Sequence, residues 1–331
     1  MTVRERVQKV LNFEKCTDRL PVVEWTNWWD KTWNRWRGEG FPDCTKEESW
    51  KIFCLDPMPL IMATCYSPDL KPAYHGAPLL ADGMTYDDLK PLVMSDKKIY
   101  DAADSARKLK PDHDKGDIAI RLHIDGFFSL PRRIFGIELH LFAFYDQPEL
   151  MHRMNTDLIE YNTRLLDAVY SVLVPEITDI AEDMSYNHGP MLSYGMFSEF
   201  LLPHYKKLVP YIKNSGSKVF IDSDGDITKM IPWFYEAGIE GVLPLERQAG
   251  VDIVTIRKQY PDFLMLGAYD KMVMSKNETA MRAEFERILP VMQSGGFIAS
   301  VDHQTPPEVS LENYKIYLKL YNEYSRRAVS S

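Results

Sequence analysis

The chain has 331 residues, and 39 Lys and Arg against 48 Asp and Glu give it a formal net charge of −9. Its hydrophobic fraction of 45% and its charged fraction of 26% are ordinary for a globular protein, which excludes disordered and fibrous classes. Because the chain is acidic and has no cluster of Lys and Arg residues, we expect neither nucleic acid nor an anionic membrane surface as its main partner.

The sequence also lacks targeting and cross-linking signals. No apolar run approaches the roughly 20 residues that span a bilayer, and the opening MTVRERVQKVLNFEK has no signal-peptide core. We therefore expect a cytoplasmic protein that does not enter a membrane. The four cysteines, Cys16, Cys44, Cys54 and Cys65, form no Cys-x-x-Cys pair, so neither a disulfide framework nor a cysteine zinc site is predicted.

The first third of the chain has a mixed pattern. Residues 4–13 have the apolar spacing of a helix, and residues 21–25 have the apolar run of a short buried strand. Residues 45–100 contain six prolines, which is typical of irregular structure. We expect a helical and irregular excursion over about 26–110 that belongs to the same domain.

After residue 110, apolar runs alternate with helical patterns. The predicted strands are 118–124, 176–181, 218–221, 241–245, 263–266 and 296–299. The predicted helices are 147–173, 193–215, 227–237, 251–260, 278–294 and 308–325. Strands that alternate with helices in this way indicate parallel βαβ units.

These units predict a barrel. Six strands after residue 110 and the strand at 21–25 leave one strand to be found within residues 45–100, and eight strands close a (β/α)8 TIM barrel. We therefore predict the α/β class and a single barrel domain over residues 1–331. An open doubly wound sheet is the alternative, but no Gly-x-Gly-x-x-Gly follows a strand to support dinucleotide binding.

Polar side chains follow the predicted strands at their carboxyl ends, where the active site of such a barrel lies. These positions are Trp25, Asn27, His123, Asp125, Asp183, Tyr186, Asp222, Asp224, Glu246, Asp270, Asp302 and His303. A single acid there is explained equally well by helix capping. Their recurrence predicts a mostly anionic crater that could hold a metal, bind a cationic or hydroxylated substrate, or supply general acids.

Two of these positions carry the most specific signals. Asp222 and Asp224 are two residues apart, so an extended strand end places both carboxylates on one face; the alternative is a plain turn after Asp224. His303 follows Asp302, and a neighbouring carboxylate can fix the tautomer of an imidazole and raise its pKa. The alternative for His303 is a structural loop histidine.

Six of the seven tryptophans lie between residues 25 and 50. Core packing is one reading of this excess. Since Trp25, Trp28, Trp29, Trp33 and Trp36 do not share one helical face, we expect several of them to line a cavity mouth or a partner surface.

Longer segments resemble a known family. They are RERVQKVLNFEKCTDRLPV, AEDMSYNHGPMLSYGMFSEFLLPHYKKL, IDSDGDITKMIPWFYEAGIEGVLPLERQAGVDI, LGAYDK and GGFIASVDHQTPPEVSLENY. The chain resembles the uroporphyrinogen decarboxylase superfamily over nearly its whole length. This superfamily includes decarboxylases and corrinoid-linked methyltransferases, so the resemblance implies a single (β/α)8 barrel but leaves the reaction open.

The decarboxylase branch fits poorly. Its members carry Arg-Gln-Ala-Gly-Arg after the first strand, where this chain reads Trp-Thr-Asn-Trp-Trp-Asp over residues 25–30. An acidic crater would also repel a substrate with eight carboxylates. Decarboxylation of a uroporphyrinogen-type substrate stays an alternative. Another is a non-catalytic barrel that binds a tetrapyrrole or presents a corrinoid partner.

The thiol-methylating branch holds zinc through His-x-Cys and a later Cys. Asp222, Asp224 and His303 stand at those places here. Oxygen and imidazole ligands form a harder site that suits thiol activation badly. Zinc bound by Asp222, Asp224 and His303 is left open.

The branch that demethylates an O-methyl or N-methyl donor fits best. Its resemblance implies a methyl acceptor, cobalamin, carried by a separate corrinoid protein, and this chain has no Asp-x-His-x-x-Gly cobalamin motif of its own. The leaving group needs a proton or a Lewis acid, which His303, Asp222, Asp224, Glu246 and Asp302 could supply. We expect the small methylated donor to contact Trp25, Asn27, Trp28, His123, Asp125, Asp183, Tyr186 and Asp270. A homodimer is left open.

Overall fold

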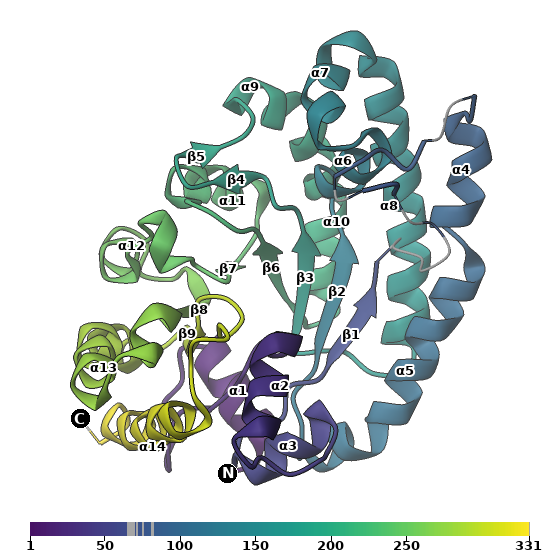
Figure 1. Ribbon diagram of the computed structural model, residues 1–331. Helices are drawn as coiled ribbons and strands as arrows, with labels where there is room; N and C mark the ends of the chain where they lie inside the picture. The colour runs from purple at the N-terminus through teal and green to yellow at the C-terminus, as the bar shows by residue number, and fades with distance from the viewer. Residues whose placement is uncertain (65–69, 71, 75, 81–82, 331) are drawn as a thin grey trace.

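The computed structural model describes residues 1–64, 70, 72–74, 76–80 and 83–330, and in this part of the chain seven parallel strands form one sheet in the order β1-β2-β3-β6-β7-β8-β9 (Figure 1). The strands are β1 (Leu60–Ala63), β2 (Arg121–Asp125), β3 (Ile177–Ala181), β6 (Lys218–Asp222), β7 (Gly241–Leu243), β8 (Leu264–Tyr269) and β9 (Phe297–Val301). A separate hairpin pairs β4 (Ser185–Tyr186) with β5 (Gly189–Pro190).

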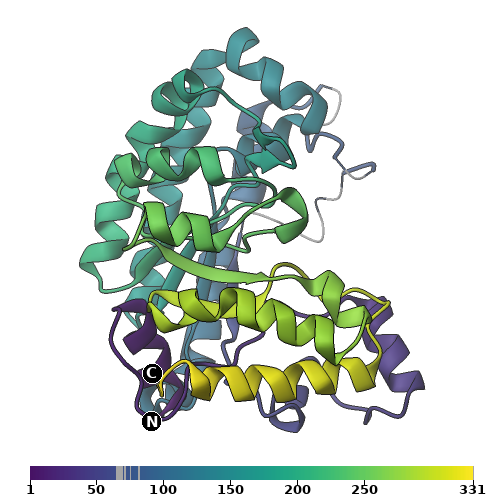
Figure 2. The ribbon, with the colours of Figure 1, turned by 90° about the vertical axis from the view of Figure 1, so that its left-hand side faces the viewer.

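Helices surround this sheet. The α-helices are α1 (Val3–Leu11), α2 (Asp30–Gly38), α3 (Lys46–Ile52), α4 (Tyr86–Val93), α5 (Asp96–Lys115), α6 (Ser129–Phe135), α7 (Ile137–Asp146), α8 (Pro148–Tyr170), α9 (Tyr194–Met196), α10 (Leu202–Asn214), α11 (Ile231–Ala237), α12 (Ile253–Gln259), α13 (Glu278–Gln293) and α14 (Leu311–Arg327). Short helical turns are η1 (Phe197–Leu201), η2 (Thr228–Met230), η3 (Arg247–Ala249) and η4 (Lys271–Ser275). Figures 1 and 2 show α13 and α14 side by side on the outside of the sheet.

The sequence pattern explains this arrangement. Every residue of β2, β3, β8 and β9 is buried, as expected when a parallel sheet has helices on one face and a packed interior on the other. The α/β class and the barrel-like architecture predicted from the alternating pattern are confirmed, but in the described residues the sheet has seven strands instead of eight, and β9 does not pair with β1. The strand expected within residues 45–100 is β1, and the six strands expected after residue 110 are all present.

The predicted strand at residues 21–25 is wrong. This stretch is extended and lies between β9 and the residues before β1, but most of its hydrogen bonds go to side chains instead of a neighbouring strand. The Val22 N–H donates to Asp56, the Val23 N–H to Tyr321, and the Trp25 N–H to the Ser300 hydroxyl. Pro21 has no N–H to donate, so a regular ladder could not include it.

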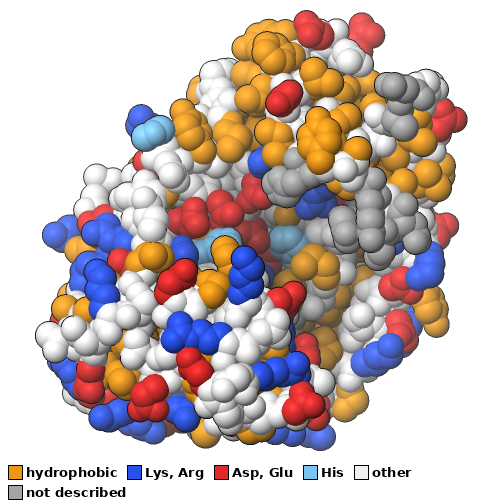
Figure 3. Space-filling model, viewed as in Figure 1, with side chains coloured by type: hydrophobic (Ala, Val, Ile, Leu, Met, Phe, Trp, Pro, Cys, Tyr) orange, Lys and Arg blue, Asp and Glu red, His pale blue; other side chains and the backbone are white. Residues whose placement is uncertain are grey.

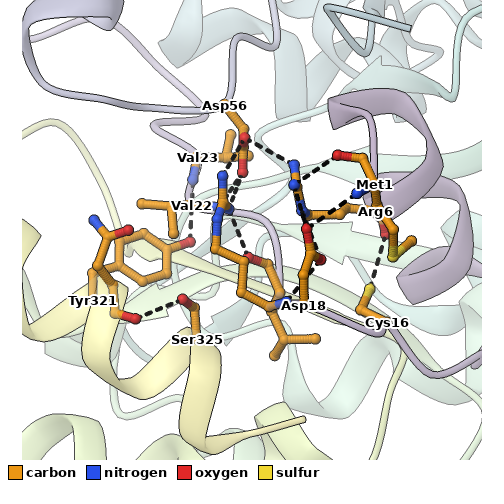
Figure 4. A network of polar contacts seen from close by, with 12 residues as sticks. Met1, Arg6, Cys16, Asp18, Val22, Val23, Asp56, Tyr321 and Ser325 are labelled. Atoms are coloured by element: carbon orange, nitrogen blue, oxygen red, sulfur yellow. Dashed lines mark hydrogen bonds and ion pairs between the residues drawn. The ribbon is translucent and has the colours of Figure 1, made fainter.

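A charged network fixes this extended stretch (Figure 4). Asp56 is 5% exposed and accepts hydrogen bonds from Arg19, at 2.7 Å to one of its oxygens, and from Arg6 at 3.4 Å. Arg6 also pairs with Asp18 at 2.6 Å, and this hydrogen bond lowers the pKa of the Asp18 carboxyl. The network joins α1 to the chain that enters β1.

Three tryptophans of the tryptophan-rich segment lie in the core, whereas Trp29 is 43% exposed and the Trp25 ring contacts His303 of the candidate site. Trp28, Trp33 and Trp36 are 1%, 6% and 0% exposed. Trp28 stacks on Trp33 with ring centroids 5.6 Å apart and meets Tyr314 of α14 edge-on at 5.9 Å. Helix α2 therefore packs against α14 through these rings, and α3 lies beside α2 (Figure 1).

The cysteines and the possible membrane spans were also considered in the sequence. Cys16, Cys44 and Cys54 are free, and Cys65 lies outside the described residues. In the described ranges, no helix has both the length and the apolar character needed to cross a membrane.

Candidate functional site

A cavity of about 400 Å³ opens at the carboxyl ends of β2, β3 and β6. Figure 3 shows acidic and histidine side chains gathered in a hollow at the centre of this face. The apolar wall contains Leu70, Pro72, Ala77, Leu79, Val93, Leu130 and Ile137. The polar wall contains His123, Ser129, Arg132, Arg133, Glu182, Asp183 and Asp222. A cavity of this size and mixed character suits a small molecule.

His123, Asp179 and Asp222 form the first polar cluster, from neighbouring strands. The His123 Nδ1 makes a short hydrogen bond with Asp179 and lies 3.6 Å from Asp222 Oδ2, and Arg121 pairs with Asp179 at 2.9 Å. Burial lowers the pKa of His123, but the negative charges of Asp179 and Asp222 outweigh it and raise the pKa overall. Burial, with repulsion from Asp179, raises the pKa of Asp222 to about 7.

Asp224, Glu246 and His303 form the second cluster, just after β6, β7 and β9. Each offers one ligand atom, and these atoms lie within 4.8 Å of one another; His303 Nε2 is 3.8 Å from Asp224 Oδ2. Burial, with the charges of Asp183 and Glu246, raises the pKa of Asp224 to about 8. Burial lowers the pKa of His303 although Glu246 opposes this.

The predicted metal trio is therefore corrected. The structure divides Asp222, Asp224 and His303 between the two clusters, because Asp222 ends β6 inside the barrel while Asp224 lies beyond it in the turn before Gly225. Two carboxylates and one imidazole at mutual ligand distances are a donor set that zinc accepts. Asp224, Glu246 and His303 thus fit a divalent ion better than the expected trio.

Asp302 does not orient His303, contrary to expectation. It is fully buried and accepts hydrogen bonds from the Arg247 N–H at 2.9 Å and the Lys271 N–H at 3.1 Å, and it pairs with the Lys271 ammonium at 3.3 Å. These contacts tie the loops after β7 and β8 to the end of β9. Burial raises the pKa of Asp302 to about 6, although Lys271 opposes this.

Two more acids from the predicted wall have structural partners. Asp270 caps η4 by accepting from the Met272 N–H at 2.8 Å, and it also accepts from the Gln248 amide at 2.6 Å. Asp125 is 1% exposed and pairs with Arg133 at 2.6 Å. Each of these acids therefore has a structural task at the carboxyl end of its strand.

Glu182 supports the loop after β2 that forms one cavity wall. Its carboxylate is fully buried and accepts hydrogen bonds from the backbone N–H groups of Phe127, Phe128 and Ser129 at 2.8, 2.7 and 3.1 Å. The Tyr205 hydroxyl donates to the same carboxylate. This side chain thereby fixes where α6 begins.

Trp25 connects the two clusters. Its indole N–H donates to the Val301 carbonyl at 2.7 Å, the Arg121 guanidinium lies 5.1 Å from its ring centroid, and its ring meets His303 edge-on at 6.5 Å. Asn27 is exposed next to the His303 loop, and its carbonyl accepts from Gln304 at 2.9 Å.

Two other predicted donor contacts lie in different surroundings. Trp28 is in the aromatic core, so its expected contact with the donor is corrected: no substrate can reach a side chain that is 1% exposed. Asp183 and Tyr186 are exposed at the carboxyl end of the barrel, and Asp183 lines the cavity.

Sequence reasoning missed Asp179 and Arg121. Both belong to predicted strands, in the runs EITDIA and IAIRLHI, and a prediction that considers only the residues after each strand does not include them. The usable signal was the charge itself, because Asp and Arg are almost never fully buried unless they are paired.

Comparisons with known proteins find a family and a fold that extend over most of the chain. A family model described as uroporphyrinogen decarboxylase (URO-D) matches residues 66–324. No curated protein sequence matches the chain. Among solved structures, a methyltransferase from Methanosarcina mazei is 14% identical with a TM-score of 0.66, over 98% of this chain and 99% of that one. That likeness supports the fold alone.

A second solved structure is more distant. A protein described as a vitamin-B12-independent methionine synthase from Listeria monocytogenes is 13% identical with a TM-score of 0.36, over 65% of this chain and 64% of that one.

Proposed function

This chain belongs to the uroporphyrinogen decarboxylase family, and we propose that it is a methyltransferase that moves a methyl group from a small methylated donor to cobalamin carried by a separate corrinoid protein. The donor is an O-methyl ether, most suitably an aromatic one, or a methylamine. A protein with the same fold over its full length is described as a methyltransferase, and this description suggested the choice of reaction within the family.

The observation that carries the proposal is the convergence of Asp224, Glu246 and His303 beside the cavity. Together with Asp183 and Asp222 they make this end of the barrel strongly acidic. Such a site repels a polycarboxylate, and a methyl donor with little or no negative charge meets much less repulsion. Acid groups that keep a proton near neutral pH are also what a poor leaving group requires.

In the proposed reaction the carbon–oxygen or carbon–nitrogen bond of the donor breaks, and its electron pair stays on the leaving atom. The corrinoid of the partner supplies the nucleophile for the methyl carbon. Burial raises the pKa of both the Asp222 and the Asp224 carboxyl groups towards neutral pH, so a substantial share of each is protonated there. Either can give its proton to the leaving atom, and Trp25 holds the His303 side of the site in place.

A divalent ion such as zinc would be held by Asp224, Glu246 and His303. When bound, it would supply a Lewis acid for the leaving oxygen. The same three residues therefore serve either as proton-handling groups or as ligands, and metal analysis of the purified protein separates the two roles.

The test is a methyl-transfer assay with a purified corrinoid protein, followed by the absorbance change of the corrinoid. We expect His303→Ala to abolish transfer while the circular dichroism spectrum is unchanged. His152→Ala is the matched control, because His152 lies on α8 with 44% of its side chain exposed. Near-normal transfer by His303→Ala would refute the role of His303, and decarboxylation of uroporphyrinogen without any methyl transfer would refute the proposed function.

A further inference from the structure

The cavity contains a positively charged side chain, Arg132, to which the proposed function assigns no role. Arg132 and Arg133 lie on α6 and line the cavity, whose other polar groups include His123, Asp183 and Asp222. The cavity therefore has a cationic side and an acidic side, which is more than a neutral methyl ether requires.

Two other arginines near the polar clusters have acidic partners. Arg133 pairs with Asp125 at 2.6 Å, and Arg121 pairs with Asp179 at 2.9 Å. Arg132 donates one hydrogen bond from Nη1 to the Asp183 backbone carbonyl at 2.9 Å. Among the residues that the structure describes it pairs with no carboxylate, so most of its donors remain available to a ligand.

Ser129, one turn before Arg132 on α6, gives a second and independent indication. It lines the same cavity, is 6% exposed, and its hydroxyl oxygen has no hydrogen-bond partner within the described ranges. A buried polar group normally has a partner, so an unpartnered one at a cavity wall points to a ligand. The nearby backbone N–H groups do not serve this purpose, since Glu182 already accepts from them.

We propose that Arg132, with Ser129, binds a carboxylate of the methyl donor, so that the donor is a small methylated carboxylic acid. A guanidinium presents paired donors that match the two oxygens of a carboxylate. The apolar wall, which includes Leu79, Leu130 and Ile137, accommodates the hydrocarbon part between the two ends. The acidic side of the cavity disfavours a second negative charge, so one carboxylate is expected. This inference rests on the proposed function for the identity of the ligand as a methyl donor.

The experiment compares acids with their neutral amides by isothermal titration calorimetry on the full chain. The two pairs are meta-methoxybenzoate with meta-methoxybenzamide, and methoxyacetate with methoxyacetamide. A charge-assisted hydrogen bond to a carboxylate should make at least one acid bind roughly tenfold or more tightly than its amide. Arg132→Gln should bring the affinity of that acid down to the affinity of the amide. Arg132→Lys should keep part of the preference, because it keeps the charge but loses the paired geometry.

Arg107→Gln is the control, since Arg107 is exposed on α5 and does not line the cavity. Thermal melting checks that each variant is folded. Equal binding of acid and amide by the wild type in both pairs would overturn the proposal, as would an acid preference that survives in a folded Arg132→Gln variant.

The two proposals fail in different ways. Acid preference that depends on Arg132, without methyl transfer from any donor, would refute the proposed function and leave the carboxylate site standing. Methyl transfer that uses acids and amides equally well would refute the carboxylate site and leave the proposed function standing.

Discussion

Replacement of Glu182 should lower the stability of the protein, because Glu182 holds the cavity wall formed by the loop after β2. Glu182→Ala removes the acceptor of three buried backbone N–H groups, at Phe127, Phe128 and Ser129, and of the Tyr205 hydroxyl. A buried donor left without a partner costs about 1–3 kcal/mol. The three N–H groups alone would cost about 3–9 kcal/mol if their costs added fully, and since water can enter the vacated space and the Tyr205 hydroxyl can turn towards it, we expect roughly 3–5 kcal/mol.

Two milder variants grade the effect. In Glu182→Gln the amide oxygen can still accept from two of the N–H groups, so the loss should be about 1–3 kcal/mol. Tyr205→Phe leaves the carboxylate and all three N–H bonds in place, so its loss should be smaller, about 1 kcal/mol. The assay is urea unfolding followed by circular dichroism, with stability taken from the transition midpoint and slope. A loss below about 1 kcal/mol in Glu182→Ala would refute the reasoning, since three orphaned donors cannot cost so little.

The remaining predictions concern pH and metal. Burial raises the pKa of Glu24 from its usual 4.5 to about 8, although a hydrogen bond from Tyr314 lowers it in part. The folded state therefore binds a proton at Glu24 more tightly than the unfolded state does. As the pH rises from 4.5 towards 8, the free energy of unfolding should fall by up to about 1.4 kcal/mol per pH unit. Glu24→Gln should remove this slope in urea unfolding at several pH values, and equal slopes would contradict the assignment. Zinc content is measured by elemental analysis after dialysis against zinc. The wild type and the Asp222→Asn variant should retain zinc, and the Asp224→Asn variant should lose it. Loss of zinc from Asp222→Asn alone would contradict the assignment of the site to Asp224, Glu246 and His303.

The strands after residue 110 could be predicted because a strand buried on both faces reads as a continuous apolar run. The same pattern misled at residues 21–25, where the run is equally apolar. Composition does not show whether a backbone N–H meets a carbonyl of a neighbouring strand or a side chain such as Asp56, Tyr321 or Ser300. Only the three-dimensional position of those side chains decides it.

The candidate site shows the same limit. Asp302 is adjacent to His303 in sequence, but its oxygens face the loops after β7 and β8. The carboxylates near His303 are Asp224 and Glu246, which come from other strands. The rule that strand ends converge found the members of the site but could not tell which acids bind the backbone and which face the cavity.

The extended stretch at residues 21–25 has a consequence for how the molecule is made. Val23 and Tyr321, which hydrogen-bond to each other, are 298 positions apart in the sequence. The contact between residues 21–25 and α14 therefore cannot form until nearly all of these residues have been synthesised. Contacts between such distant residues form slowly because a long loop must close first. During translation the early segment should therefore remain without this contact, and accessible to chaperones and proteases, until α14 has left the ribosome.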